Sequence, residues 1–322
     1  MLRVFVPAST GLVSTEWPAG TPPPENALWL DLCEPTPEEE QRVEQGLGID
    51  VPSREEMREI EASNRLYEEN GALHMTATLV TKLDTDQGQS TQVTFILAGK
   101  RLVTSRYADP LSFRRFIAFA QTHPATCGSA SLLLAGLLEA VVNRIADVLE
   151  QIGSDIEAIS ARVFIQRRKR PHDFRGELGQ IGQGGELVSK TRESLVSLSR
   201  LLGFLQQSNN TERITPEARA SLRTVSGDVV ALSDHATFLG DKVQFLLDAT
   251  LGMVQIDQNN ILKIFSVVAV LLLPPSVIGA FYGMNFTNIP WLHEPWGVWA
   301  ALAMMLVSAL APYAYFRRKG WL

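Results

Sequence analysis

The chain has 322 residues, a formal net charge of −6 at neutral pH and only two cysteines, Cys33 and Cys127. An acidic balance without a basic, aromatic-rich patch argues against nucleic-acid binding. Two widely spaced cysteines offer no metal-ligand spacing and fit a reducing compartment. Residues Met1–Pro7 lack the apolar core and cleavage site of a signal peptide, so we expect the N-terminal region to stay in the cytoplasm.

Residues 1–128 alternate between short strands and short helices, which predicts a small α/β domain. Residues 27–32 form a buried strand, and Thr36-Pro37 then begins a helix with threonine as the N-cap. We expect a second short helix at 53–62. We then expect two hairpins, one at 64–82 around the Asn70-Gly71 turn and one at 91–105.

Residues 129–210 predict a pair of long helices, and residues 211–263 a stalk helix that continues into the next segment. The first helix, 129–166, ends at the basic run Arg167–Arg170, which we interpret as a solvated helix end. The second, 174–207, is weakened by Gly179, Gly182, Gly184 and Gly185. The third begins at Thr215-Pro216, and at 1.5 Å per residue its ~65 residues would extend roughly 100 Å. A helix that long needs partners, and identical neighbours supply them most simply.

Two C-terminal segments are long and apolar enough to cross a bilayer. Residues 264–283 form the first predicted transmembrane helix, 284–295 a periplasmic loop, 296–316 the second transmembrane helix and 317–322 a basic tail. The alternative is a buried hairpin in a soluble core. Lysine and arginine occur before the first span and after the second but not in the connecting loop, which predicts that both ends face the cytoplasm. Tryptophans suited to membrane interfaces flank the spans: Trp291, Trp296, Trp299 and Trp321.

No enzyme motif occurs in the chain. The sequence lacks a phosphate-binding Gly-x4-Gly-Lys-Ser/Thr loop, a His-Glu-x-x-His pair and paired Cys-x-x-Cys units, and its five histidines are scattered. The sequence therefore predicts a protein that is not an enzyme and needs no catalytic cofactor.

One side of the first span carries small and polar residues. At 100° per residue, one stripe collects Asn259, Leu262, Ser266, Ala269, Leu273, Ser276, Ala280 and Gly283. The stripe is either a tight helix-packing surface or the lining of a pore whose leucines form apolar constrictions. Neither span has an ionisable side chain other than tyrosine, which favours a passive conduit over a coupled carrier. We expect Pro274-Pro275 to break the backbone ladder in mid-span.

Acidic and amide residues lie at the two ends of this stripe. Asp248 and Asn259 fall at the inner end and Asn285 at the outer end. Their oxygens suit a hard cation, and Mg²⁺ gives up its water reluctantly. A ring of neutral amide and carbonyl oxygens is expected to hold the hydrated ion without trapping it.

These residues resemble the CorA magnesium channels. The resemblance rests on Tyr282-Gly283-Met284-Asn285-Phe286 at the outer end of the first of two C-terminal spans, on Leu273-Pro274-Pro275 and on the terminal stretch 311–322. It extends over the whole chain through Asp31-Leu32, Glu59–Ser63 and Gly71–His74.

The resemblance implies an α+β membrane protein that forms a funnel-shaped homopentamer. Each subunit would have an N-terminal α/β/α cytoplasmic domain, long stalk helices and two C-terminal transmembrane helices, the first of which lines the pore. Gly283 and Asn285 would form the outer selectivity ring, supported by Met284 and Tyr282. Asn259, Leu262, Leu273 and Ser276 would line the pore, and Asp248 would lie near its cytoplasmic mouth. Family members close when cytoplasmic Mg²⁺ binds carboxylates between subunits, and the candidates here are Asp228, Asp234 and Asp241.

The outer loop departs from the family's magnesium pattern. Here it reads Ile289-Pro290-Trp291-Leu292 followed by His293-Glu294. The family's zinc-transporting branch often has an Ile-Pro loop, and histidine is a ligand that zinc tolerates; alternatively, His293 is only an exposed loop residue. Glu294 is expected to concentrate cations at the mouth.

We therefore predict a homopentameric, multi-pass channel of a bacterial inner membrane that conducts Mg²⁺, with Co²⁺ and Ni²⁺ as minor cargo. Its partners would be copies of itself and the lipid bilayer. The alternative on the same scaffold is a proton-coupled zinc transporter. A rival of another class is a membrane-tethered helical interaction protein without a conduit.

Overall fold

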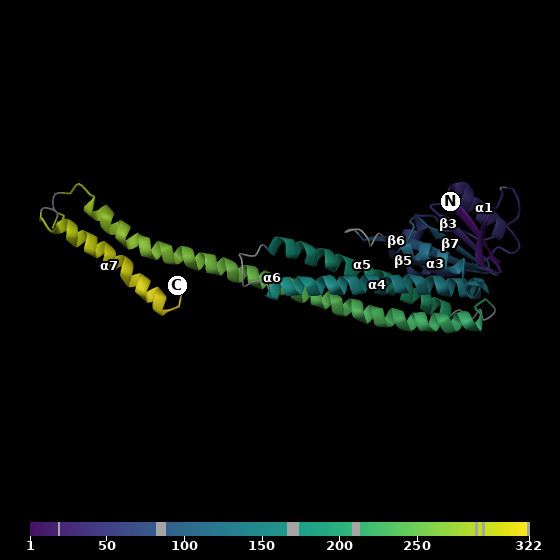
Figure 1. The fold of residues 1–322 in the computed structure, drawn as a ribbon. Helices are drawn as coiled ribbons and strands as arrows, with labels where there is room; N and C mark the ends of the chain where they lie inside the picture. The colour runs from purple at the N-terminus through teal and green to yellow at the C-terminus, as the bar shows by residue number, and fades with distance from the viewer. Residues whose placement is uncertain are drawn as a thin grey trace. The chain divides into compact units, whose positions relative to one another are not determined.

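The structure, a computed structural model, describes residues 1–18, 20–81, 88–165, 174–207, 213–286, 289–291 and 294–320. The chain forms two compact units, Met1–Leu247 and Asp248–Leu322. The longest helix, α6 (Pro216–Tyr282), contributes to both units. Figure 1 shows the order of the elements, from the sheet in purple and blue to the last helix in yellow.

The first unit is built on a seven-stranded sheet with the strand order β2-β1-β3-β7-β6-β5-β4. The strands are β1 (Leu2–Ala8), β2 (Gly11–Thr15), β3 (Trp29–Cys33), β4 (Leu66–Glu69), β5 (Ala72–Thr81), β6 (Gln89–Ala98) and β7 (Arg101–Arg106). Every neighbouring pair is antiparallel except β3 and β7, which run parallel. The predicted hairpins are present, and both central residues of the β4–β5 turn have a positive φ (Asn70 48°, Gly71 74°).

One face of the sheet is covered by α1 (Pro37–Leu47). Thr36 begins this helix as predicted, because its side chain accepts a hydrogen bond from Glu39 N (3.3 Å) and Glu39 in turn accepts one from Thr36 N (3.0 Å). Val43 of α1 packs into a core with Val4, Leu30, Leu32, Ile96 and Val103 of the sheet.

The helix predicted at 53–62 was wrong. The structure has only a 3₁₀ turn, η1 (Glu56–Arg58), and a single helical turn, α2 (Ala62–Arg65). Ser53 caps the first turn through Glu56, but Glu59 adopts an extended ψ of 146°, which ends it. Ser53 therefore supplies the N-terminal cap of a helix, but the residues after Arg58 do not continue that helix.

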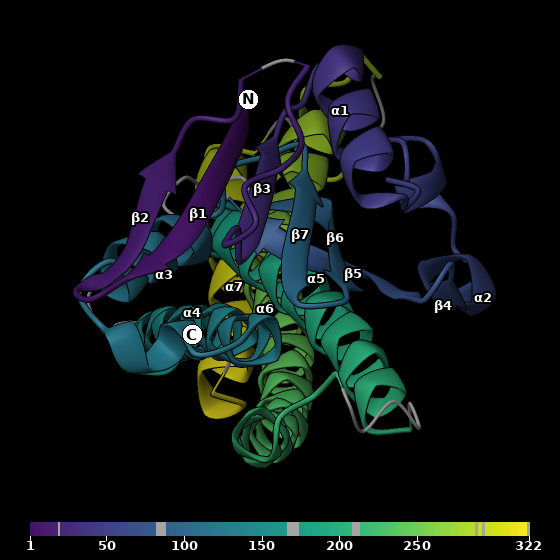
Figure 2. The ribbon, with the colours of Figure 1, turned by 90° about the vertical axis from the view of Figure 1, so that its right-hand side faces the viewer.

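The opposite face of the sheet is covered by α3 (Leu111–Ala120), α4 (Ala130–Ile165) and α5 (Phe174–Gln207), and the 3₁₀ turn η2 (Pro124–Cys127) joins α3 to α4. Aromatic rings fill this side: Phe5 stacks on Trp29 at 4.9 Å, and Phe113 on Phe95 at 6.2 Å. Figure 2 shows the sheet between α1 on one side and α3, α4 and α5 on the other. The first unit is thus the three-layer α/β/α domain that the resemblance implied.

A buried ion pair joins the parallel strands at the centre of the sheet. Asp31 of β3 and Arg106 of β7 are both fully buried, and the guanidinium binds the carboxylate through two hydrogen bonds of 2.9 Å. Arg3 and Thr104 each donate a further hydrogen bond of 2.8 Å to Asp31. Burial alone would lower the pKa of Arg106, but its hydrogen bonds to Asp31 and the charge of Asp31 raise it above its ordinary value.

Within the first unit α4, α5 and the N-terminal half of α6 pack side by side (Figure 1). Lys242 of α6 forms an ion pair of 3.3 Å with Glu157 of α4, and Gly240 and Gly185 mark close approaches of α5 and α6. In this half of α6 the buried apolar residues are three, four or seven positions apart, as expected for one helix face, and they are Ala218, Leu222, Val225, Val229, Ala236, Leu239 and Leu246. The basic run Arg167–Arg170 lies outside the described residues.

Candidate functional site

Two helices of the second unit are long and apolar enough to cross a membrane. They are the C-terminal part of α6 and α7 (Gly297–Arg318), and only 6% and 11% of their most apolar windows are buried. The buried core hairpin that the sequence left open as an alternative would hide most of these residues. The exposure of the two helices favours an apolar solvent around them.

Helix α7 runs back along the end of α6 and packs against one side of it (Figure 1). Val267 of α6 is only 2% exposed and Ala301 of α7 only 8%. A Cβ atom built on Gly279 would lie 3.2 Å from Met305 Cε. The positions that follow Val267 at helical spacing, Leu271, Pro274, Ile278 and Tyr282, are each partly buried. These residues define the α7-facing side of α6.

The small and polar stripe lies on the side of α6 away from α7. All eight of its residues, Asn259 to Gly283, are exposed, and its two leucines are 62% (Leu262) and 67% (Leu273) exposed. At 100° per residue the stripe is roughly opposite the α7-facing side. The stripe is therefore not the surface on which α7 of the same chain packs. This excludes α7 as the partner in the helix-packing interpretation of the stripe.

The Gly-Met-Asn tripeptide follows directly where α6 ends. Tyr282 is the last helical residue, Gly283 N still donates to Gly279 O (3.0 Å), and Met284 N donates to Phe281 O (3.3 Å). Asn285 comes after the turn and is exposed. The stripe and the tripeptide thus meet at one end of α6, where backbone carbonyls and an amide side chain offer neutral oxygens to a cation.

We expected Pro274-Pro275 to break the backbone hydrogen-bond ladder, and α6 continues as a helix through both prolines with that ladder interrupted. Proline has no N–H, so the carbonyls of Val270 and Leu271 lose their usual partners four residues on. The hydroxyl of Ser276 donates to the next carbonyl, Leu272 O, at 2.7 Å. The backbone stays helical here although two hydrogen bonds of the ladder are missing.

The connection to α7 depends on Gly297, a residue that the sequence analysis missed. Trp291 has a φ of 62° and its ring lies 5.6 Å from that of Trp296. Trp291 O accepts from Glu294 N (3.3 Å), and Glu294 O accepts from Gly297 N (2.9 Å). A Cβ atom at Gly297 would lie 2.0 Å from Trp291 O, so only glycine fits this arrangement. The only sign of this requirement in the sequence was a glycine at the start of an apolar helix.

The remaining candidate residues are spread over exposed positions. Asp228, Asp234, Asp241 and Asp248 lie on exposed positions of α6, and Glu294 is exposed before α7. Among the residues that the structure describes, no three histidine, cysteine or acidic side chains gather closely enough within one chain to hold a metal ion. His293 and Trp321 lie outside the described residues.

An α/β/α domain, a helix that runs from that domain into an apolar segment, and a second apolar helix after a Gly-Met-Asn turn define a class of two-span membrane transport protein. The chain belongs to the CorA family: the family model described as "CorA-like Mg2+ transporter protein" matches residues 24–318. It is a member of a transporter family rather than an enzyme, as the sequence predicted.

Relatives cover nearly the whole chain. The chain is 36% identical over 297 residues to the magnesium transport protein CorA of Haemophilus influenzae, with 92% of each chain covered. It is 34% identical, over the same length and coverage, to the protein of that name from Escherichia coli K12. The complete structure of the CorA magnesium transporter from Methanocaldococcus jannaschii has the same fold, with a TM-score of 0.80, 19% identity and coverage of 100% of this chain and 99% of that one.

Proposed function

We propose that this chain is the subunit of a homopentameric channel that admits Mg²⁺ across a bacterial inner membrane, with Co²⁺ and Ni²⁺ as minor cargo. One observation carries the proposal: the α6 stripe is exposed, faces away from α7 and leads to the Gly-Met-Asn turn. Five copies of α6 around an axis would turn these stripes inward and leave α7 toward the lipid. The magnesium transport proteins among the relatives support Mg²⁺ as the cargo.

The outer ring would select the hydrated ion. Carbonyl oxygens of Gly283 and amide oxygens of Asn285 would contact the water shell of Mg²⁺, while Met284 and Tyr282 support the turn. Neutral oxygens bind weakly enough to let the ion leave, as conduction requires. Glu294 would raise the local cation concentration at the entrance.

The ion would then descend along the stripe toward the inner end of α6. Leu273 and Leu262 would be its narrow, apolar sections, which close by losing water. The wider sections would be lined by Ala280, Ser276, Ala269, Ser266 and Asn259, with Asp248 at the inner mouth. The membrane potential supplies about 2.3 kcal/mol per elementary charge per 100 mV. A divalent cation needs no proton or second ion to be driven inward by it.

The orientation and regulation follow the same reasoning. Arg317 and Arg318 in the last turn of α7, and Lys319 after it, favour an orientation with both termini in the cytoplasm. Internal Mg²⁺ would close the channel by binding carboxylates between neighbouring α6 helices. Asp228, Asp234 and Asp241 are candidates because each is exposed on its own subunit.

Mg²⁺ entry into liposomes that contain the purified protein tests the proposal. We expect voltage-driven entry at matched pH, suppression by high internal Mg²⁺ and loss of entry in Asn285→Ala. The matched control is Val307→Ala, which removes a 63% exposed group from α7 and should conduct normally. Normal conduction by Asn285→Ala would remove the filter role. Zn²⁺ entry that requires an inward proton gradient would replace the magnesium channel with a zinc transporter.

A further inference from the structure

The two halves of α5 differ in how they are held. From Val188 onward eight side chains are buried, whereas residues 174–185 bury only Phe174 and Ile181. The second half is also tied to the sheet: Lys190 Nζ donates to Gly88 O at 2.7 Å, and Ser197 Oγ accepts from Thr78 N at 2.9 Å. The second half of α5 is therefore more deeply buried than the first.

The first half contains five glycines, and packing requires only one of them. A Cβ atom at Gly176, Gly179, Gly182 or Gly184 would meet nothing within 4 Å, and none of these residues has a positive φ. At Gly185 a Cβ atom would lie 3.2 Å from Val243 Cγ1 of α6. Glycine is the poorest helix former apart from proline. Four of the five glycines thus lower the helix propensity of this half of α5 without being required by its packing.

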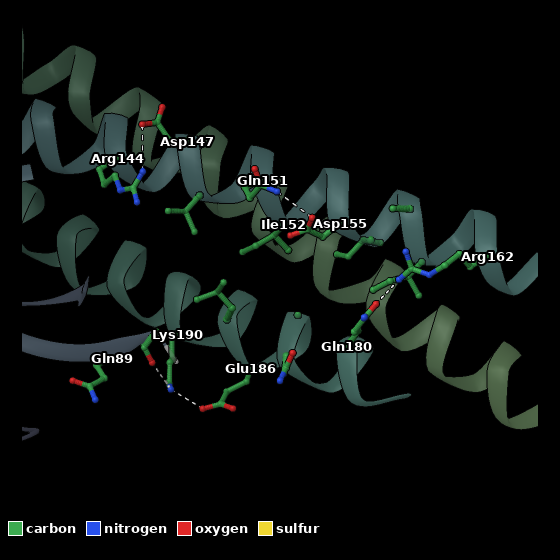
Figure 3. Close-up of a pocket in the computed structure, with 18 residues that line it drawn as sticks. Gln89, Arg144, Asp147, Gln151, Ile152, Asp155, Arg162, Gln180, Glu186 and Lys190 are labelled. Atoms are coloured by element: carbon green, nitrogen blue, oxygen red, sulfur yellow. Dashed lines mark hydrogen bonds and ion pairs between the residues drawn. The ribbon is translucent and has the colours of Figure 1, made fainter. Parts of the chain in front are cut away.

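A cavity of about 1080 Å³ lies between α4 and residues 180–190 of α5, so its α5 wall includes the end of this half-helix. Figure 3 shows α4 and α5 as its two walls, bridged at one end by Arg162 and Gln180. On the α5 wall Lys190 binds Glu186 at 2.6 Å, and on the α4 wall Gln151 binds Asp155 at 3.0 Å. Among the described residues that line the cavity, the Arg162–Gln180 hydrogen bond joins the two walls, and Lys190 also donates to Gly88 O.

We propose that residues 174–185 of α5 form a compliant strap, which opens and closes over the α4–α5 cavity while the rest of the domain stays folded. Gly185, whose Cβ position lies 3.2 Å from Val243 Cγ1 of α6, marks the end of this strap. Segments of low local stability are the parts of a protein that open without global unfolding.

Hydrogen exchange on the full chain in detergent tests the strap. In the wild-type protein, amides of residues 174–185 should exchange at least roughly tenfold faster than those of 188–205. Alanine at Gly176, Gly179, Gly182 and Gly184 together should slow the exchange of the strap, by about fivefold for each substitution that falls within the opening unit. The matched control is Gly203→Ala in the second half, where a Cβ atom also meets nothing within 4 Å. It should leave exchange of the strap unchanged.

Two results would overturn the proposal. Equal protection of both halves in the wild-type protein would show that the glycines do not loosen α5. Loss of the oligomer in the four-alanine variant, measured by light scattering, would show that a neighbouring copy packs on these glycines and that they serve close contact instead. Neither result depends on whether the protein conducts Mg²⁺.

Discussion

The imidazole of His74 lies on β5, opposite Tyr67 of β4, and is only 1% exposed. The two rings stack with centroids 4.6 Å apart and planes 4° apart. Nδ1 of His74 has no hydrogen-bond partner among the described residues. Burial lowers the pKa of His74, and the charges of Glu69 and Asp50 oppose this shift without cancelling it. Burial, with the nearby carboxylates, also raises the pKa of Tyr67 to about 12.

A lowered histidine pKa makes stability depend on pH. The unfolded chain binds a proton at His74 below a pH of about 6.5, while the folded chain does so only at lower pH. The contribution of His74 is therefore complete above that value and is lost as the pH falls. We expect His74→Phe, which keeps a ring beside Tyr67, to flatten the fall in unfolding free energy between about pH 6.5 and 5. The difference should reach at most about 1.4 kcal/mol per pH unit.

Urea unfolding followed by tryptophan fluorescence at several pH values measures this difference. His235→Phe is the control, because His235 is exposed on α6, where it stacks on Phe238, and should not change the slope. If the wild-type and His74→Phe proteins lose stability in parallel, His74 titrates normally in the folded state.

At the scale of single elements, the connection before α7 offers a sharp test of geometry. Gly297→Ala places a methyl group against Trp291 O and must displace the turn that carries Glu294. Functional groups need positions within about 0.5 Å, so we expect Mg²⁺ entry into liposomes to fall roughly tenfold or more. Val298→Ala, which trims a 68% exposed neighbour, should conduct normally. Equal entry through both variants would show that the turn does not position the entrance.

The elements that the sequence predicted correctly were specified by neighbouring residues. Thr36 and Glu39 form their capping box within one turn, and Asn70-Gly71 makes its hairpin by backbone conformation alone. The helix expected at 53–62 failed because Ser53 supplies a cap but nothing beyond Arg58 sustains the helix. At Pro274-Pro275 the missing N–H groups interrupt the hydrogen-bond ladder as predicted, while the helix itself continues through both residues.

The same division applies to the candidate site. Gly283, Met284 and Asn285 were identified as candidates because their position after an apolar run is a local signal. The stripe remained ambiguous, since its meaning depends on where α7 packs, which lies some thirty residues further along the chain. Gly297 was missed because its requirement comes from Trp291 O across a turn. Residues whose role arises from contact between distant segments leave little trace in the sequence.

At the scale of the whole molecule, the proposed pore predicts which side of the membrane helices faces water. We expect Cd²⁺, which binds thiolates, to block Mg²⁺ entry in Leu273→Cys when the native cysteines Cys33 and Cys127 have been replaced by alanine. Leu273 is 67% exposed on the stripe, and the control, Val307→Cys, places a thiol at a 63% exposed position of α7. The control should conduct normally with Cd²⁺ present. Equal block of both variants, or of neither, would contradict a pore lined by the stripe.

The position of the unit boundary within α6 has a consequence for biosynthesis. The first unit ends at Leu247, and the apolar run begins only at Ile264, so the ribosome completes the α/β/α domain before the first span emerges. At about 5–20 residues per second, the 17 residues from Leu247 to Ile264 take about one to three seconds to translate, so folding of the first unit has a short head start on membrane insertion. We expect the insertion machinery to have only two helices left to place once this unit is complete.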